Sequence, residues 1–249
     1  MRKFSLFLCI IFQSLFGFGQ ALTFYDSYQI PISDTSKVDV GYIRVQFIEN
    51  GVFHDQLFTI DSVKVSHLIA LLDENDAKKS QQMTSYFPDG TISSKTKTDF
   101  ENDRMEEMYY YPNGKLKRTS TSTSGTVDTE RFFSPDGKEI EKPEIVEASP
   151  KRGRNDWINY LMRNLRYPPE ARKLKKSGTV MLKVLLDENG LINRIAVLNP
   201  EQIHHALANE AIRVTEEYPH HWNPQTENGQ PVPSEIILPF RFSLEAGVR

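Results

Sequence analysis

A short pattern of aromatic residues, proline, aspartate or asparagine, and glycine occurs three times in the middle of the chain and determines what this part can fold into. Its copies span residues 86–92, 110–116 and 132–140. The turn glycines Gly90, Gly114 and Gly137 lie 24 and then 23 residues apart. Proline presets φ for a turn, aspartate or asparagine tolerates the left-handed region, and glycine takes the positive φ that closes the turn. The period therefore predicts one β-hairpin per copy.

The residues before the repeats also predict β-structure. Apolar and polar residues alternate through much of 38–72, and Asn50-Gly51 between two such runs is a strong hairpin signal. Residues 63–72 fit a strand or a short helix, and the pattern does not decide between them. We expect a β-rich domain over residues 20–141. The repeats resemble the MORN-like repeats of bacterial envelope proteins over residues 85–140, and this resemblance implies an extended sheet that serves as a scaffold or an interaction surface.

The first residues of the chain are expected to be a signal peptide, residues 1–19. Arg2 and Lys3 give a positive start, residues 4–16 are almost wholly apolar, and Gly17 and Gly19 are small enough for signal peptidase. This predicts export to the periplasm, with Cys9, the only cysteine, removed with the peptide. The alternative is an uncleaved inner-membrane anchor.

The last part of the chain predicts a small α+β domain over residues 155–249, after a charged, proline-containing linker at 142–154. Trp157, Leu161 and Leu165 have the spacing of one helix face, and Asn155 or Asp156 is expected to cap this helix. Pro168-Pro169 ends it and begins another. Two strands at 179–186 and 191–198, a helix over about 203–218 and a strand at 234–243 complete the domain, predicting helices on a three-stranded antiparallel sheet.

Ordered landmarks within this domain resemble the TonB C-terminal domain over residues 157–244. They are Tyr167-Pro168 with Ala171, Gly178-Thr179-Val180, Leu186-Asp187-Glu188-Asn189-Gly190, Ala211-Ile212, Trp222-Asn223-Pro224, Asn228-Gly229-Gln230-Pro231-Val232 and Pro239-Phe240-Arg241-Phe242. The resemblance implies that a segment of an outer-membrane TonB-dependent transporter, or of another envelope protein, adds to the sheet as an extra strand.

The last strand is the expected position of this peptide. Pro239 has no amide hydrogen, so it belongs on an edge strand or at a bulge, and an edge strand has a free side. The residues to which we carry the peptide-binding role are Glu235, Ile236, Ile237, Leu238, Pro239 and Phe240. The inward-facing members of this set are also expected to pack the core.

Other classes of site are not expected. The chain has no nucleophile elbow, no phosphate-binding glycine loop and no His-Glu-x-x-His sequence, so we expect no enzyme and no cofactor. The pairs His204-His205 and His220-His221 are expected to be solvated, because adjacent residues on a helix point about 100° apart and their rings would not share a metal ion. Nine basic residues gather between Lys151 and Lys176. We interpret them as a solvated face; attraction to acidic transporter segments or anionic envelope polymers is the alternative, and nucleic acid is the least expected partner.

Three functional hypotheses follow. The first is a periplasmic TonB-like protein that captures an extended peptide of a transporter. The second is an energy transducer for transmembrane transport, anchored in the inner membrane and driven by motor proteins there. Against it stand the short linker and the position of the first histidine, His54, because TonB proteins carry a long proline-rich arm and a histidine in the anchor. The third is a non-catalytic envelope scaffold.

Overall fold

The computed structural model of the protein describes residues 21–244, which form two compact units. The first unit consists of residues 21–25 and Asp34–Lys142. The second consists of Asp26–Ser33 and the described residues from Pro143 onward. The expected signal peptide at 1–19 lies outside the described residues.

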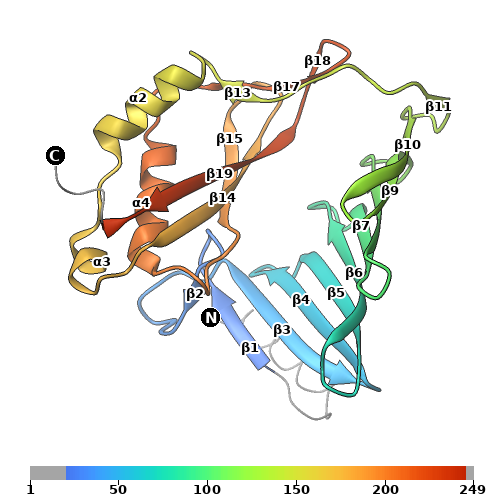
Figure 1. Cartoon of the computed structure of the whole chain (residues 1–249), viewed down its shortest axis with the longest axis horizontal. Coiled ribbons are helices and arrows are strands. Elements are labelled where there is room, and N and C mark those ends of the chain that lie inside the picture. Colours follow the sequence, from blue (N-terminus) through green and yellow to red (C-terminus); the bar gives the residue numbers. More distant parts are fainter. Residues whose placement is uncertain (1–20, 245–249) are drawn as a thin grey trace. The chain divides into compact units, whose positions relative to one another are not determined.

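An antiparallel sheet makes up the first unit, and most of its strands lie beside their neighbours in sequence (Figure 1). Within this unit the strand order is β11-β10-β9-β8-β7-β6-β5-β4-β3-β1. The strands are β1 (Ala21–Tyr25), β3 (Tyr42–Glu49), β4 (Val52–Thr59), β5 (Lys64–Leu72), β6 (Lys78–Tyr86), β7 (Ile92–Asp99), β8 (Arg104–Tyr110), β9 (Leu116–Thr123), β10 (Thr126–Phe133) and β11 (Glu139–Ile140). The segment that the sequence left open between strand and helix is therefore the strand β5.

Each copy of the repeat forms the turn of a hairpin, as the period predicts. The copies join β6 to β7, β8 to β9 and β10 to β11. Each turn is closed by a backbone hydrogen bond, from Phe87 N to Thr91 O at 2.7 Å in the first copy. Gly90, Gly114 and Gly137 have φ of 85°, 78° and 91°, which explains why each copy needs a glycine at this place.

Buried apolar residues in the first unit concentrate at its beginning. Ile43, Val45 and Phe47 of β3 form a small core, with Phe24 and Phe58 packed against it. From β6 onward few side chains are buried, and the strands are rich in serine, threonine and charged residues. Cross-strand pairs replace a core in this region, such as Arg118 with Glu130 at 3.0 Å.

The second unit is an α+β fold in which helices pack on a three-stranded antiparallel sheet of order β15-β14-β19. Its main elements are α2 (Arg154–Asn164), α3 (Pro169–Lys173), β14 (Gly178–Leu186), β15 (Ile192–Val197), α4 (His205–Glu216) and β19 (Ser234–Phe242). Alternate residues of β14 from Val180 to Leu186 are almost completely buried, as are Leu207, Ala211 and Val214 of α4. The alternation in the strands and the three-and-four spacing in α4 thus produce the core.

The segment that the sequence predicts to be a linker contains two short strands that pair within the second unit. β12 (Ile145–Val146) pairs with β17 (Gln225–Glu227), and β13 (Ser149–Pro150) pairs with β16 (Trp222–Asn223). Each of these strands has only two residues, so the sequence shows no apolar–polar alternation that would predict them. β17 also pairs with β18 (Gln230–Val232).

The start of α2 also differs from the prediction. Gly153, with φ 86°, is the N-cap residue of α2, and no side chain caps the helix. Asn155 and Asp156, the expected capping residues, already lie within the first turn.

The short segment Asp26–Ser33, which contains β2 (Pro31–Ile32), is part of the second unit. Ile30 is 8% exposed and belongs to the core around β14 and α4. Tyr28 O accepts a hydrogen bond from Val197 N at 2.9 Å, and Tyr28 OH donates to Glu216 at 2.8 Å. Asp26 Oδ1 accepts from the backbone N–H groups of Tyr28 and Ile30, which fixes the local turn. A segment from the beginning of the chain therefore completes the C-terminal core.

Aromatic residues fill one end of this core. Trp157 meets Tyr218 and Trp222 edge to face, with ring centroids 4.8 Å and 5.4 Å apart. Tyr218 OH donates a hydrogen bond to Asp156 at 3.1 Å. Burial and this hydrogen bond raise the pKa of Tyr218 to about 12.

The raised pKa makes the second unit sensitive to alkali. Between about pH 10 and about pH 12 the unfolded chain loses the Tyr218 proton and the folded chain keeps it, so the free energy of unfolding falls as the pH rises through this window. Tyr218→Phe should weaken this pH dependence. At neutral pH the variant should lose only the stability that the hydrogen bond to Asp156 contributes. Urea titrations followed by tryptophan fluorescence at several pH values measure the slope. An unchanged slope in the variant would contradict the assignment.

Candidate peptide-binding edge

β19 is an edge strand of the C-terminal sheet. It pairs along its whole length with β14, with Val180 opposite Phe240 and Val184 opposite Ile236. Within residues 21–244, no second strand pairs with its other side. Figure 1 shows β19 beside β14 in the second unit.

Hydrogen bonds of Met181 reveal which backbone groups of β19 point to the free side. Met181 N donates to Asn199 Oδ1 at 3.0 Å, and Met181 O accepts from Leu198 N at 2.9 Å. Both groups therefore point away from β19. In an antiparallel pair, two opposite residues either exchange both hydrogen bonds or both turn away, and these arrangements alternate along the strand. Pro239 lies opposite Met181, so its backbone points away from β14 to the free edge.

This alternation divides the six predicted residues into two sets. Glu235, Ile237 and Pro239 direct their backbone groups to the free edge. Ile236, Leu238 and Phe240 lie opposite Val184, Leu182 and Val180, bond to β14 and turn their side chains toward the core. Phe240 is only 2% exposed. The second set thus supports the edge by packing.

Arg241 belongs to the edge as well, although the residues predicted from the sequence end at Phe240. It lies opposite Thr179, two residues beyond Pro239, and its side chain is exposed. The two-residue period of the strand is the signal that could have identified it. The edge residues Glu235, Ile237, Pro239 and Arg241 thus offer carbonyl groups throughout but no N–H at Pro239.

Side chains along the edge face solvent. Ile237 is 51% exposed, and Glu235 forms an ion pair with Lys183 at 3.0 Å. Because Glu235 is exposed and Lys183 is only half-buried, solvent screens the pair and it contributes little to stability. The surface available to a guest strand therefore combines two apolar side chains, Ile237 and Pro239, with charges of both signs.

The opposite edge of the same sheet is partly covered by the chain itself. Leu198 N bonds toward β14, so the neighbouring Val197 N points to the outer side of β15, where Tyr28 O accepts its hydrogen bond. The two edges of the sheet therefore differ. One is blocked at Val197 by the segment Asp26–Ser33, and the other has no paired strand among the described residues.

One histidine pair lies differently from the prediction. His204 is the N-cap residue of α4 and has extended backbone angles, φ −66° and ψ 131°, so it precedes the helix. The rings of His204 and His205 stack at 4.4 Å with an interplanar angle of 30°. The expectation that adjacent rings point apart is wrong for this pair because it assumed that both residues are helical.

Basic residues on the leading face of the domain are exposed, as expected. They are Lys151, Arg152, Arg154, Arg163, Arg166, Arg172, Lys173, Lys175 and Lys176. Tyr167 and Trp222, two of the family landmarks, pack in or against the core.

Comparison with known proteins bears on the C-terminal part of the chain. None of the helices in residues 21–244 combines the length and the apolar character that crossing a bilayer requires. No curated protein and no solved structure matches the chain. Residues 163–244, which contain the whole of the open-edged sheet, match the family of the Gram-negative bacterial TonB protein C-terminal domain.

Proposed function

We propose that this chain is a periplasmic TonB-like binding protein that captures an extended peptide of an outer-membrane transporter by strand addition at β19. The family match supports an envelope protein that acts in the coupling of energy to transport. The observation that carries the finer proposal is the direction of the backbone groups of Glu235, Ile237, Pro239 and Arg241. In this proposal, backbone hydrogen bonds provide affinity and the exposed side chains select the guest.

Pro239 gives the guest strand a preferred alignment. The edge donates N–H groups at Glu235, Ile237 and Arg241, and Pro239 leaves a gap between the last two. A guest carbonyl placed opposite this gap stays bonded to water. A guest peptide therefore forms the most hydrogen bonds when its extended segment lies beside Glu235 and Ile237.

In the same proposal the protein is non-catalytic, and the first unit serves as a scaffold or interaction surface for further envelope partners. Its MORN-like repeats over 85–140 remain a prediction from the sequence. The signal peptide at 1–19 exports the protein. The alternatives are an inner-membrane energy transducer and a scaffold without peptide binding.

The start of the mature protein separates export from anchoring. N-terminal sequencing of protein purified from the envelope is expected to begin at Gln20. A chain that keeps Met1 would favour the transducer, in which residues 4–18 stay in the membrane.

Ile237→Pro tests the edge directly. The N–H of Ile237 points to the free side, so its removal should leave the β14 ladder intact while a guest strand loses one hydrogen bond and meets the proline ring. We expect the Kd of a labelled transporter plug peptide to rise about tenfold or more, measured by fluorescence anisotropy.

Two further variants control this experiment. Ile237→Ala keeps the N–H and should change the Kd less than the proline variant. Leu238→Pro removes an N–H that bonds to β14 and should destabilise the second unit itself. Equal affinity of wild type and Ile237→Pro, with both folded, would contradict binding at this edge, and the absence of binding to any plug peptide would remove the proposal altogether.

A further inference from the structure

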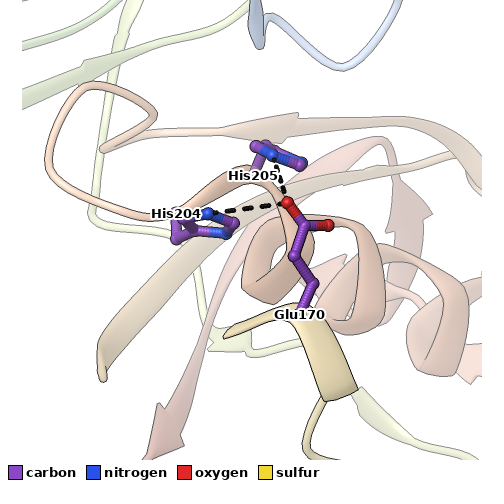
Figure 2. A group of neighbouring side chains, drawn as sticks. All are labelled: Glu170, His204 and His205. Atoms are coloured by element: carbon purple, nitrogen blue, oxygen red, sulfur yellow. Dashed lines mark ion pairs between the residues drawn. The ribbon is translucent and has the colours of Figure 1, made fainter. Parts of the chain in front are cut away.

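Three side chains from two neighbouring segments converge at the start of α4 (Figure 2). Glu170 lies in α3, and His204 and His205 are the N-cap and first residues of α4. Glu170 Oε1 lies 3.3 Å from His205 Nε2 and 3.9 Å from His204 Nε2. Within residues 21–244, this is the one group of three or more metal-ligating side chains whose donor atoms lie within 4.8 Å of one another.

The convergence results from the backbone at His204. Because this residue is extended and His205 begins the helix, the two rings turn to the same side and stack. Figure 2 shows both rings directed at the same carboxylate oxygen of Glu170. A pair that is adjacent in sequence therefore presents two nitrogen donors to one point.

We propose that Glu170, His204 and His205 bind a divalent transition-metal ion such as Zn²⁺ or Cu²⁺. Two imidazole nitrogens and one carboxylate oxygen suit these ions, whereas Mg²⁺ and Ca²⁺ require mainly oxygen donors. Donors held about 2.1 Å from a tetrahedral Zn²⁺ lie about 3.4 Å apart, close to the 3.3 Å and 3.9 Å found.

The exposed side chains of the group can move by the small distance that separates the observed donor positions from those of a bound ion. The side chains of Glu170 and His205 are each 56% exposed, whereas that of His204 is 13% exposed. His204 thus supplies a fixed donor around which the other two move. Three protein donors leave at least one position for water or for a donor from another molecule.

Binding competes with a cap of α4. His204 Nδ1 accepts a hydrogen bond from Ala206 N at 3.3 Å, which assigns the proton of the neutral ring to Nε2. A metal ion at Nε2 requires that this proton move to Nδ1, and Ala206 N–H then loses its acceptor. The hydrogen bond is at the long end of the usual range, so the loss is small compared with a metal–nitrogen bond. Arg172 and Lys173 of α3 lie close in sequence to Glu170 and repel a cation, so we expect micromolar affinity.

Calorimetry with zinc chloride on tag-free, EDTA-treated full-length protein tests the site. We expect one equivalent of Zn²⁺ to bind with a micromolar Kd. His205→Ala and Glu170→Gln should each raise this Kd about tenfold or more, because each removes one of three donors or its charge. Electron paramagnetic resonance of the Cu²⁺ complex should show two nitrogen ligands in the wild type and one in His205→Ala.

Matched controls use the other histidines. The double variant His220→Ala/His221→Ala removes an adjacent pair that is not part of such a group, and His67→Ala breaks the facing pair in which His54 Nδ1 and His67 Nε2 are 3.1 Å apart. Both should bind Zn²⁺ as the wild type does. Tryptophan fluorescence verifies that the variants of the second unit are folded, since Trp157 and Trp222 both lie there, and circular dichroism does so for His67→Ala in the first unit. The absence of saturable binding, wild-type affinity in Glu170→Gln and His205→Ala, or loss of binding only in a control variant would each overturn the proposal.

Discussion

Replacing Gly190 by alanine is expected to lower the free energy of unfolding of the second unit by about 3 kcal/mol. Gly190 ends the turn between β14 and β15 and has φ 76°. A Cβ at this position would lie 1.9 Å from Trp222 O and 2.8 Å from Trp222 C. The hydrogen bond from Trp222 N to Gly190 O, at 3.0 Å, holds the two backbones together. Because the clashing atoms belong to the backbone of Trp222, the clash can be relieved only if β16 moves away from the turn.

Gly229→Ala is the matched control. Its φ is 77°, and no atom lies within 4 Å of the position that a Cβ would take, so only the left-handed backbone is penalised, by about 1 kcal/mol. Urea unfolding followed by tryptophan fluorescence measures both variants selectively, since the two tryptophans, Trp157 and Trp222, belong to the second unit. Equal losses in the two variants would show that the turn does not press against Trp222.

Ile30→Ala is expected to destabilise the second unit by about 3 kcal/mol, although residue 30 is more than a hundred residues from the rest of that unit. The side chain is 8% exposed and lies in the C-terminal core, so its truncation leaves a cavity. The surrounding helices and strands pack against one another and cannot move to fill it. The tryptophan-monitored transition should therefore move to lower urea. The transition of the first unit should remain in place.

Val38→Ala serves as the comparison for this variant. Val38 is 46% exposed and belongs to the first unit, so its truncation should change either transition by less than about 0.5 kcal/mol. Circular dichroism reports the β-rich first unit alongside the tryptophan signal. An Ile30→Ala protein that keeps the wild-type tryptophan transition would show that the Ile30 side chain contributes nothing to the stability of the C-terminal core.

Locally encoded features were predictable from the sequence. Asn50-Gly51 connects β3 and β4, and the three proline-glycine turns connect successive strands, because the φ values that such turns require are available to few residues. The alternation in 179–186 and the helical spacing from 203 to 218 likewise produced β14 and α4. Pro239 correctly indicated an edge strand.

Features that depend on distant partners were not predictable in this way. Asp26–Ser33 mixes polar and apolar residues without a period and contains a proline, and only its contacts with the distant residues Val197 and Glu216 explain its position. The strands β12 and β13, within residues 145–150, are too short to show a period in the sequence. The convergence of His204 and His205 follows from one extended residue, which the helical pattern of α4 conceals. For the candidate edge, the sequence located the strand, and the bonds of Met181 were needed to separate edge residues from core residues.

The position of Tyr28 has a consequence for the order in which the chain can fold. Its hydroxyl bonds to Glu216, which is 188 residues away. A ribosome releases residues 26–33 long before α4 exists, so these residues wait without their final neighbours while nearly the whole polypeptide is made. Closing so large a loop is entropically costly and slow. We therefore expect the hairpins of the first unit, which need only adjacent strands, to form before the C-terminal core, which forms only once α4 and β19 are available.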